Sequence, residues 1–313
     1  MAENTKIRQN GMIEIIRFLC SFWVAYYHGF FPVLSDKFAG VNVSVDIFFM
    51  ISGFFFLRSI EKYRDRPFKE GVRYIGWVKN KSIIVPIIIA ATSVLICNVT
   101  VAPDWGGFNW PFSFLWFFVA QFVFTLLFFW LYRVFKRRFA FNIACGVIVC
   151  IFMCLFRLNI RAIDIPLRGP AMLAMGILLS QIPKIALKLK NELAAKRMTL
   201  AINIVGFVIS FATALYLAYL PEYHVWKLHL FTLVVCPMLL YFATSISIKS
   251  KILNLLGEIS IFIYLAQCPI LLHYYYVSRD HKLQFVLLCI CAAVMFVINR
   301  LVNRKKKLKK NMV

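Results

Sequence analysis

The sequence predicts an all-α, polytopic membrane protein of about ten transmembrane helices with both termini in the cytoplasm. Apolar residues account for 62% of the 313 residues, and charged residues account for only 16%. The apolar residues form runs of about 20, the length that an α-helix needs to cross ~30 Å of hydrocarbon. Basic residues gather in alternate loops, as they do when those loops remain in the cytoplasm. Composition, run length and charge asymmetry therefore agree on one fold class.

Ten apolar runs follow one another along the chain, and we expect each to form a transmembrane helix. They cover residues 11–32, 41–57, 82–101, 111–132, 139–156, 169–182, 198–220, 228–248, 252–277 and 283–301. The sixth run is short for a span, which leaves open a helix that begins before Pro166. No linker rich in Pro, Gly or Ser separates the runs, so a single membrane-embedded domain, residues 1–313, is expected. The first run lacks a cleavable-signal pattern, so its helix is expected to remain.

The distribution of Lys and Arg tests this topology. With both ends inside, 28 basic residues lie in inner segments and 7 in outer segments, and Arg17 lies within the first helix. Adding or removing one helix would invert every later loop and destroy the asymmetry. Topology and anionic headgroups thereby account for the net charge of +23, so no nucleic-acid partner is expected. All nine cysteines fall within apolar runs, so no disulfide framework in exposed loops is expected.

Three ionisable residues lie in the first apolar run, where a charge is costly unless it faces a polar interior. Arg17 and His28 are eleven residues apart in the chain. At 100° per residue, this spacing is ~20° from three complete turns, so they share one helix face with a rise of ~16 Å between them. A lipid-facing Arg in mid-span is improbable, so the pair predicts a polar cavity; taken alone, His28 would be a neutral imidazole bonded to a neighbouring helix. Glu14 is interpreted as a capping or interfacial residue.

The second predicted helix carries two polar residues, Asp46 and Ser52, in an otherwise apolar run. Their spacing places them on different faces of a helix. Asp46 lies near the outer end of the run, where it is either solvated or holds the His28 imidazole in one tautomer. Ser52 either lines the cavity or forms a packing pair with Gly53, because small residues let membrane helices approach closely.

Further candidates lie in the loops or toward the end of the chain. The longest loop, residues 58–81, is basic and contains Tyr74 and Trp77. Its aromatic residues are typical of interfacial anchors, and its charge would also suit a polyanionic donor such as a coenzyme with phosphates. Glu258 is either a contact of the donor or base, or an interfacial residue. Gln267 is interpreted as an interhelical hydrogen-bonding residue.

Three arginines, Arg157, Arg161 and Arg168, lie in an outer segment and so depart from the positive-inside trend. One interpretation is that they bind an anionic acceptor. The other is that they are tolerated in a loop that follows several established helices.

Four patches of the sequence carry a family resemblance. They are Arg17 and His28 with ten residues between them, VDIFFMISGF at residues 45–54, Leu-Trp-Phe at residues 115–117 with Trp116, and Leu-Gly-Glu-Ile-Ser at residues 256–260 with Tyr-Leu at 264–265. This combination resembles acyltransferase family 3 of membrane-bound O-acyltransferases. The resemblance reaches from the first to the ninth helix and is densest in the first sixty residues. Two features depart from the family pattern: Gln267 stands where a His is common, and Lys79 and Lys81 stand where Arg-x-x-Arg often opens the third helix.

The resemblance implies a ten-helix core that moves acyl groups from cytoplasmic acyl-CoA, usually acetyl-CoA, to sugars of surface or exported glycans at the cell membrane. It implies that Arg17 and His28 are essential. On this basis His28 is the expected base, Arg17 the expected ligand of the donor's phosphates or carbonyl, and Asp46 their expected partner in catalysis. The expected donor- or substrate-binding residues are Ser52, Lys79, Lys81, Trp116, Arg168 and Glu258. Direct transfer and a brief acyl-enzyme on His28 both fit.

Acetyl-CoA is expected as a co-substrate, with no permanently bound cofactor and no metal ion. The expected partners are acyl-CoA, a carbohydrate or glycolipid acceptor and the lipid bilayer. The alternative function is a secondary transporter or flippase of a small or lipid-linked substrate. Transporters tend to have paired halves with broken helices in matching positions, and the Gly and Ser pattern of the second helix has no counterpart in the seventh.

Overall fold

The structure is a computed structural model that describes residues 10–27, 44–78, 81–101, 116–157, 161–219, 230–276 and 280–311. All regular secondary structure in these ranges is helical, which confirms the predicted all-α class. The chain divides into two compact units. Unit 1 contains Met1–Cys20, Lys37–Glu61 and Val134–Glu258, and unit 2 contains Ser21–Asp36, Lys62–Arg133 and Ile259–Val313. Each unit is therefore assembled from segments that are distant in the sequence.

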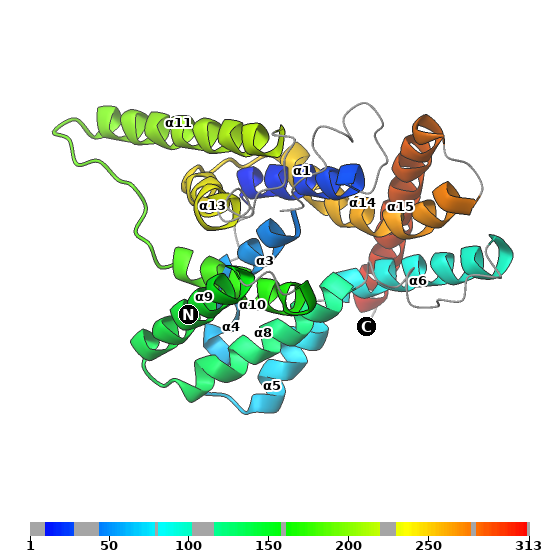
Figure 1. Ribbon diagram of the computed structural model, residues 1–313, viewed down its shortest axis with the longest axis horizontal. Coiled ribbons are helices and arrows are strands. Elements are labelled where there is room, and N and C mark those ends of the chain that lie inside the picture. Colours follow the sequence, from blue (N-terminus) through cyan, green and yellow to red (C-terminus); the bar gives the residue numbers. More distant parts are fainter. Residues whose placement is uncertain are drawn as a thin grey trace. The chain divides into compact units, whose positions relative to one another are not determined.

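Each of the ten predicted runs contains a described helix, and further short helices lie between the second and third runs (Figure 1). They are α1 (Gly11–Tyr27), α3 (Ser44–Phe54), α4 (Phe56–Ile60), α5 (Phe68–Arg73), α6 (Lys81–Val101), α8 (Trp116–Val134), α9 (Arg138–Arg157), α10 (Arg161–Leu179), α11 (Glu192–Tyr219), α13 (Cys236–Ser245), α14 (Lys251–Tyr276) and α15 (His281–Asn311). Short 3-10 and π segments add η1 (Glu61–Tyr63), η2 (Tyr74–Val78) and η4 (Phe231–Val235). The number of spans and the sides on which the termini lie stay predictions.

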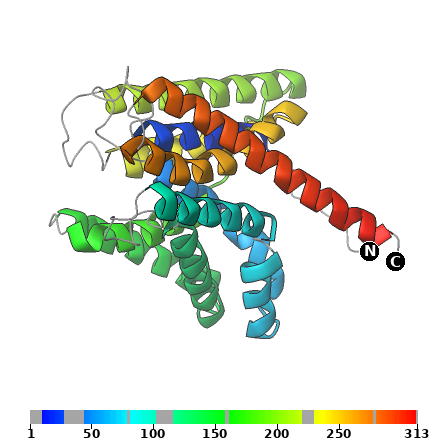
Figure 2. The ribbon, with the colours of Figure 1, turned by 90° about the vertical axis from the view of Figure 1, so that its right-hand side faces the viewer.

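Among the described residues, four stretches of helix are long and apolar enough to cross a membrane: Phe117–Val134, Arg138–Leu155, Glu192–Leu217 and Lys282–Val302. At most 28% of each stretch is buried inside the protein, so most of its apolar side chains face outward. The last of them belongs to α15, the long red helix of Figure 2. Side chains of this kind are stable against lipid tails and would be unfavourable in water. The protein is therefore a membrane protein.

The sixth predicted run begins too late in the sequence. Helix α10 starts at Arg161 instead of residue 169, so the helix does begin before Pro166. The apolar pattern hides this start because Arg168 interrupts it. In the structure, Arg168 forms an ion pair with Asp46, and a paired charge is compatible with a helix inside a membrane.

The predicted loop at residues 58–81 is largely helical, which corrects its interpretation as a loop. Helix α4 reaches Ile60, and η1, α5 and η2 follow it. In unit 2, α5 is held against α8 by the rings of Phe68 and Phe129, whose centroids are 5.6 Å apart. The Arg133 guanidinium lies 5.7 Å from the first ring and 5.8 Å from the second. These contacts give the short helix an apolar surface on which to fold, despite its high charge.

Helices α3 and α10 form the tightest packing of unit 1, and two glycines make it possible. A Cβ atom built on Gly53 would lie 2.0 Å from the carbonyl oxygen of Leu173. A Cβ atom built on Gly176 would lie 2.0 Å from the carbonyl oxygen of Met50. The two backbones are therefore in direct contact, as small residues allow in membrane helices. This confirms the packing interpretation for Gly53, and the role of Ser52 stays a prediction.

Alanine at Gly53 or at Gly176 is expected to destabilise the protein by about 1–3 kcal/mol or more, because the added methyl group must push the two backbones apart. Thermal unfolding of the detergent-solubilised variants measures the effect. Gly146→Ala on α9 is the matched control, since its Cβ would meet no atom within 4 Å. A Gly53→Ala variant as stable as the Gly146→Ala variant would contradict the proposed backbone contact.

Lys184 contacts residues of both α3 and α13 at one end of unit 1. Its ammonium lies 4.9 Å from the ring centroid of Phe54 and 4.6 Å from that of Tyr241. It also donates a hydrogen bond to the Thr244 hydroxyl. The Tyr241 hydroxyl donates a bond of 2.8 Å to the Pro183 carbonyl. Partial burial lowers the pKa of Lys184 to about 8. The ends of α3 and α13 thus meet the segment that follows α10.

In unit 2, α14 is joined to the second half of α1 by a buried amide. Gln267 is 0% exposed, and its Nε2 donates a hydrogen bond of 3.2 Å to the Ser21 carbonyl oxygen. This confirms the interpretation of Gln267 as an interhelical hydrogen-bonding residue. On the same helix, the Tyr264 ring packs 5.8 Å from Phe117 and 5.5 Å from Phe118 of α8.

Candidate active site

The candidate site in unit 1 begins with an ion pair within α1. Nη1 of Arg17 lies 3.0 Å from Oε2 of Glu14, one turn earlier on the same helix face. The Glu14 side chain is only 11% exposed, and that of Arg17 is 36% exposed. The capping interpretation of Glu14 is wrong, because Asn10 caps the helix by accepting a hydrogen bond of 3.0 Å from the Met12 amide. Glu14 instead supplies the counter-charge that Arg17 needs inside an apolar helix.

Helix α14 contributes a glycine, Gly257, whose missing side chain leaves room for Glu14 in the same site. A Cβ atom built on Gly257 would lie 1.7 Å from Oε2 of Glu14 and 2.7 Å from its Cβ. The Glu14 carboxylate therefore occupies the volume that a side chain at position 257 would fill. The next residue, Glu258, is exposed and interacts electrostatically with Glu14. Two of the patches that carry the family resemblance, around Arg17 and around Gly257, thus meet in unit 1.

A second ion pair joins α3 to α10. Nε and Nη2 of Arg168 each lie 2.6 Å from a carboxylate oxygen of Asp46, and Asp46 is 1% exposed. This bidentate geometry gives the strongest hydrogen bonding that an Arg and a carboxylate form. The interpretation of Asp46 as a solvated residue is therefore wrong. Arg168 lies in a helix, so its interpretation as an arginine tolerated in a loop is wrong too.

The other predicted site residues are only partly described. Ser52 is half-buried on α3, next to the close contact with α10. His28 and Lys79 lie outside the described residues, as do the side chains of Lys81, Trp116, Arg157 and Arg161. The alignment of Arg17 with His28, and the orientation of His28 by Asp46, stay predictions.

The basic segment before α6 holds its cations over aromatic rings. The Lys62 ammonium lies 5.0 Å from the Tyr63 ring and 5.2 Å from the Tyr74 ring, and these two rings stack at 4.5 Å. The Arg64 guanidinium lies 4.5 Å from the Tyr132 ring. Such contacts favour one position of a long side chain. These contacts therefore favour defined positions for the Lys62 and Arg64 charges of unit 2.

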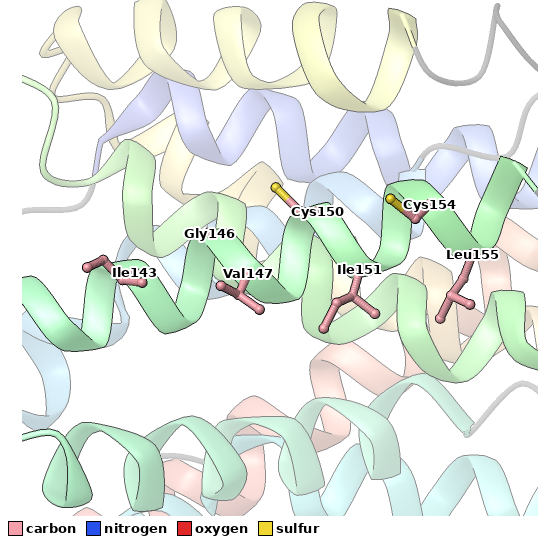
Figure 3. A pocket seen from close by; sticks show the side chains of 7 residues that line it. All are labelled: Ile143, Gly146, Val147, Cys150, Ile151, Cys154 and Leu155. Atoms are coloured by element: carbon pink, nitrogen blue, oxygen red, sulfur yellow. The ribbon is translucent and has the colours of Figure 1, made fainter.

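The hollow drawn in Figure 3 is a different kind of feature. Its volume is about 550 Å³, and the residues that line it all belong to α9: Ile143, Gly146, Val147, Cys150, Ile151, Cys154 and Leu155. They form two rows with a spacing of four residues, so the hollow is the groove between two ridges of one helix. Its lining offers no acid, base or cation. Such an apolar groove suits a lipid tail or another helix.

A family model described as an acyltransferase domain, that of acyltransferase family 3, matches residues 10–302. The chain belongs to acyltransferase family 3. The match runs from the residue before α1 into α15 and includes every residue of both ion pairs. No curated protein and no solved structure matches the chain. This member of acyltransferase family 3 is thus a membrane acyltransferase.

Two site features were absent from the sequence-based prediction. The Glu14–Arg17 pair had a signal, because an acid three residues before an Arg faces it on a helix. The pairing of Asp46 with Arg168 had no signal in the sequence, because 122 residues separate the two.

Proposed function

We propose that this protein is an acetyl-CoA-dependent O-acetyltransferase of the cell membrane. It moves an acetyl group from cytoplasmic acetyl-CoA to a hydroxyl of a cell-surface or exported carbohydrate. Family membership supports the acyl transfer. The observation that carries the proposal furthest is the Arg17–Glu14 pair, a charged group held inside an apolar helix next to Gly257 of α14. Charges in such positions are retained for function, because they are costly to place in a membrane.

Arg17 serves the donor in this proposal. Its guanidinium is always charged, carries five N–H donors in a planar fork and lies beside the Glu14 carboxylate. Such a fork suits either the phosphates of coenzyme A or the thioester carbonyl, whose oxygen becomes negative as the bond to the acceptor forms. The ion pair fixes the direction of the fork before the donor arrives.

His28 serves the acceptor. An imidazole with a pKa near its usual ~6.5 can take a proton and return it near neutral pH. His28 takes the proton of the acceptor hydroxyl, the oxygen attacks the thioester carbonyl, and the C–S bond breaks. The coenzyme A thiolate leaves and the proton on His28 returns to it. In the acyl-enzyme alternative, the thioester C–S bond breaks as the acetyl–His28 bond forms, and the acceptor hydroxyl then takes the acetyl group while its proton passes to the coenzyme A thiolate.

The other residues support this chemistry. Asp46, paired with Arg168, stiffens the contact of α3 with α10 and so positions Ser52 for the substrate. The cations of the segment before α6, together with Lys79 and Lys81, attract the phosphates of the donor. Trp116 and Glu258 complete the proposed set of donor- and substrate-binding residues. The transporter or flippase alternative is not favoured by the family match.

Radiolabelled acetyl-CoA supplied to inverted membrane vesicles tests the proposal. The acetyltransferase consumes the donor and transfers label to a glycan, whereas a transporter or flippase leaves it intact. Deletion of the protein is expected to reduce the mass of the surface polysaccharide by the mass of its acetyl groups. Vesicles that contain the protein and its membrane glycan, yet consume no acetyl-CoA above the level of empty vesicles, would contradict the proposed function.

A further inference from the structure

We infer that Gly257 is a positioning residue: the space left by its missing side chain receives the Glu14 carboxylate, which in turn holds the Arg17 guanidinium toward the acyl donor. The role assigned to Arg17 rests on the proposed function. The space itself is a feature of the packing of α14 against α1. The inference thus links two helices of unit 1 that meet at one carboxylate.

The first step is steric. Oε2 of Glu14 would lie 1.7 Å from a Cβ atom at position 257, and the Glu14 carboxyl carbon would lie 2.5 Å from it. No side chain other than that of glycine fits while the carboxylate stays in place. The Glu14 Cβ, at 2.7 Å, is also too close, and it cannot turn away as the end of the side chain can. Alanine at position 257 must therefore move the carboxylate and also push α1 from α14.

The second step is electrostatic. The same oxygen, Oε2 of Glu14, is the atom that lies 3.0 Å from Nη1 of Arg17. Moving it away from position 257 therefore breaks the ion pair directly. Glu258 also interacts with Glu14, so the carboxylate has a second negative charge near it and depends on Arg17 for compensation. Gly257 thus acts on the guanidinium through Glu14, without touching it.

The test uses the full chain purified in detergent, with coenzyme A as the probe and isothermal titration calorimetry as the measurement. Gly257→Ala and Glu14→Ala are each expected to weaken the binding of coenzyme A by about tenfold or more, the loss expected of one charge-assisted contact. The double variant is expected to bind as weakly as either single variant, because both changes remove the same contact. Gly146→Ala, with open space around it, is expected to bind within twofold of the unchanged protein.

Thermal unfolding of the same proteins provides an independent measurement. Gly257→Ala is expected to lower Tm more when Glu14 is present than in the Glu14→Ala background, where only the close approach of the Cβ atom at position 14 remains. A purely structural role of Gly257 predicts the same loss of Tm in both backgrounds, and that result overturns the inference. Equal binding of coenzyme A by Gly257→Ala and the unchanged protein overturns it as well.

The two measurements separate this inference from the proposed function. If the unchanged protein binds no coenzyme A and consumes no acetyl-CoA, the proposed donor is wrong. The dependence of Tm on the Gly257–Glu14 combination would still decide whether the carboxylate occupies that space.

Discussion

Replacing Arg17 with alanine is expected to abolish acetyl transfer while leaving the protein in the membrane. The substitution removes the only part of the Glu14–Arg17 pair that can bind an anionic donor.

His28→Ala removes the proposed base and is expected to lower kcat by about 10²–10⁴-fold. The rate of acetyl-CoA consumption by inverted vesicles measures both effects, with the amount of protein in each preparation determined by immunoblotting.

Arg300→Ala provides a control for the loss of a helical arginine. Its guanidinium lies 4.7 Å from the Phe296 ring on α15, and no proposed site residue is a partner of that ring contact. This variant is expected to retain most of the activity. Arg17→Lys keeps the charge but loses the fork, so it is expected to recover only a small part of the rate. Full turnover by Arg17→Ala or by His28→Ala would remove that residue from the mechanism.

Replacing Asp46 with alanine is expected to destabilise the protein by about 3–5 kcal/mol, the usual result when one partner of a buried ion pair is removed. The Asp46 carboxylate is 1% exposed, and two short hydrogen bonds join it to Arg168. Without it, the guanidinium keeps its charge and loses its main compensation. Chemical or thermal unfolding in detergent, followed by circular dichroism, measures the difference.

The Glu192–Lys196 pair of α11 provides the matched comparison. Its atoms lie 2.5 Å apart, but the two side chains are 83% and 71% exposed. Glu192→Ala is expected to cost at most about 0.5 kcal/mol, because water replaces the lost contact. Exchanging both Asp46 and Arg168 for apolar residues of similar volume is expected to recover much of the lost stability. An Asp46→Ala variant as stable as Glu192→Ala would show that the Arg168–Asp46 pair contributes little to the fold.

The positions of the helices could be predicted from the sequence because a long apolar run has few structural alternatives in a membrane. Each backbone amide must be satisfied within the run, so the run becomes a helix. This argument failed where charge interrupted the pattern. Arg168 hid the start of α10, and the charges of residues 58–81 hid α5. In both places a distant partner, Asp46 or the Phe129 ring, stabilises what the local sequence does not.

The candidate site was predictable only in part, for the same reason. Arg17 stood out because an arginine within an apolar run needs an explanation, and the residue three positions earlier should have supplied it. Gly257 stood out only as part of the patch at residues 256–260 that carries the family resemblance, and the sequence assigned it no contact, because its contribution is an absent side chain. Only the position of Glu14 against α14 shows what that absence permits.

The pairing of α3 with α10 also constrains how the protein is made. A ribosome delivers Asp46 to the membrane long before it delivers Arg168, since 122 residues separate them. During that interval the Arg168 side of the ion pair is missing, and an apolar environment would not accept the carboxylate as an anion. Helix α3 is therefore expected to remain in a more polar environment, or bound to a chaperone, until α10 has left the exit tunnel. Only then can α3 pack in its final position against α10.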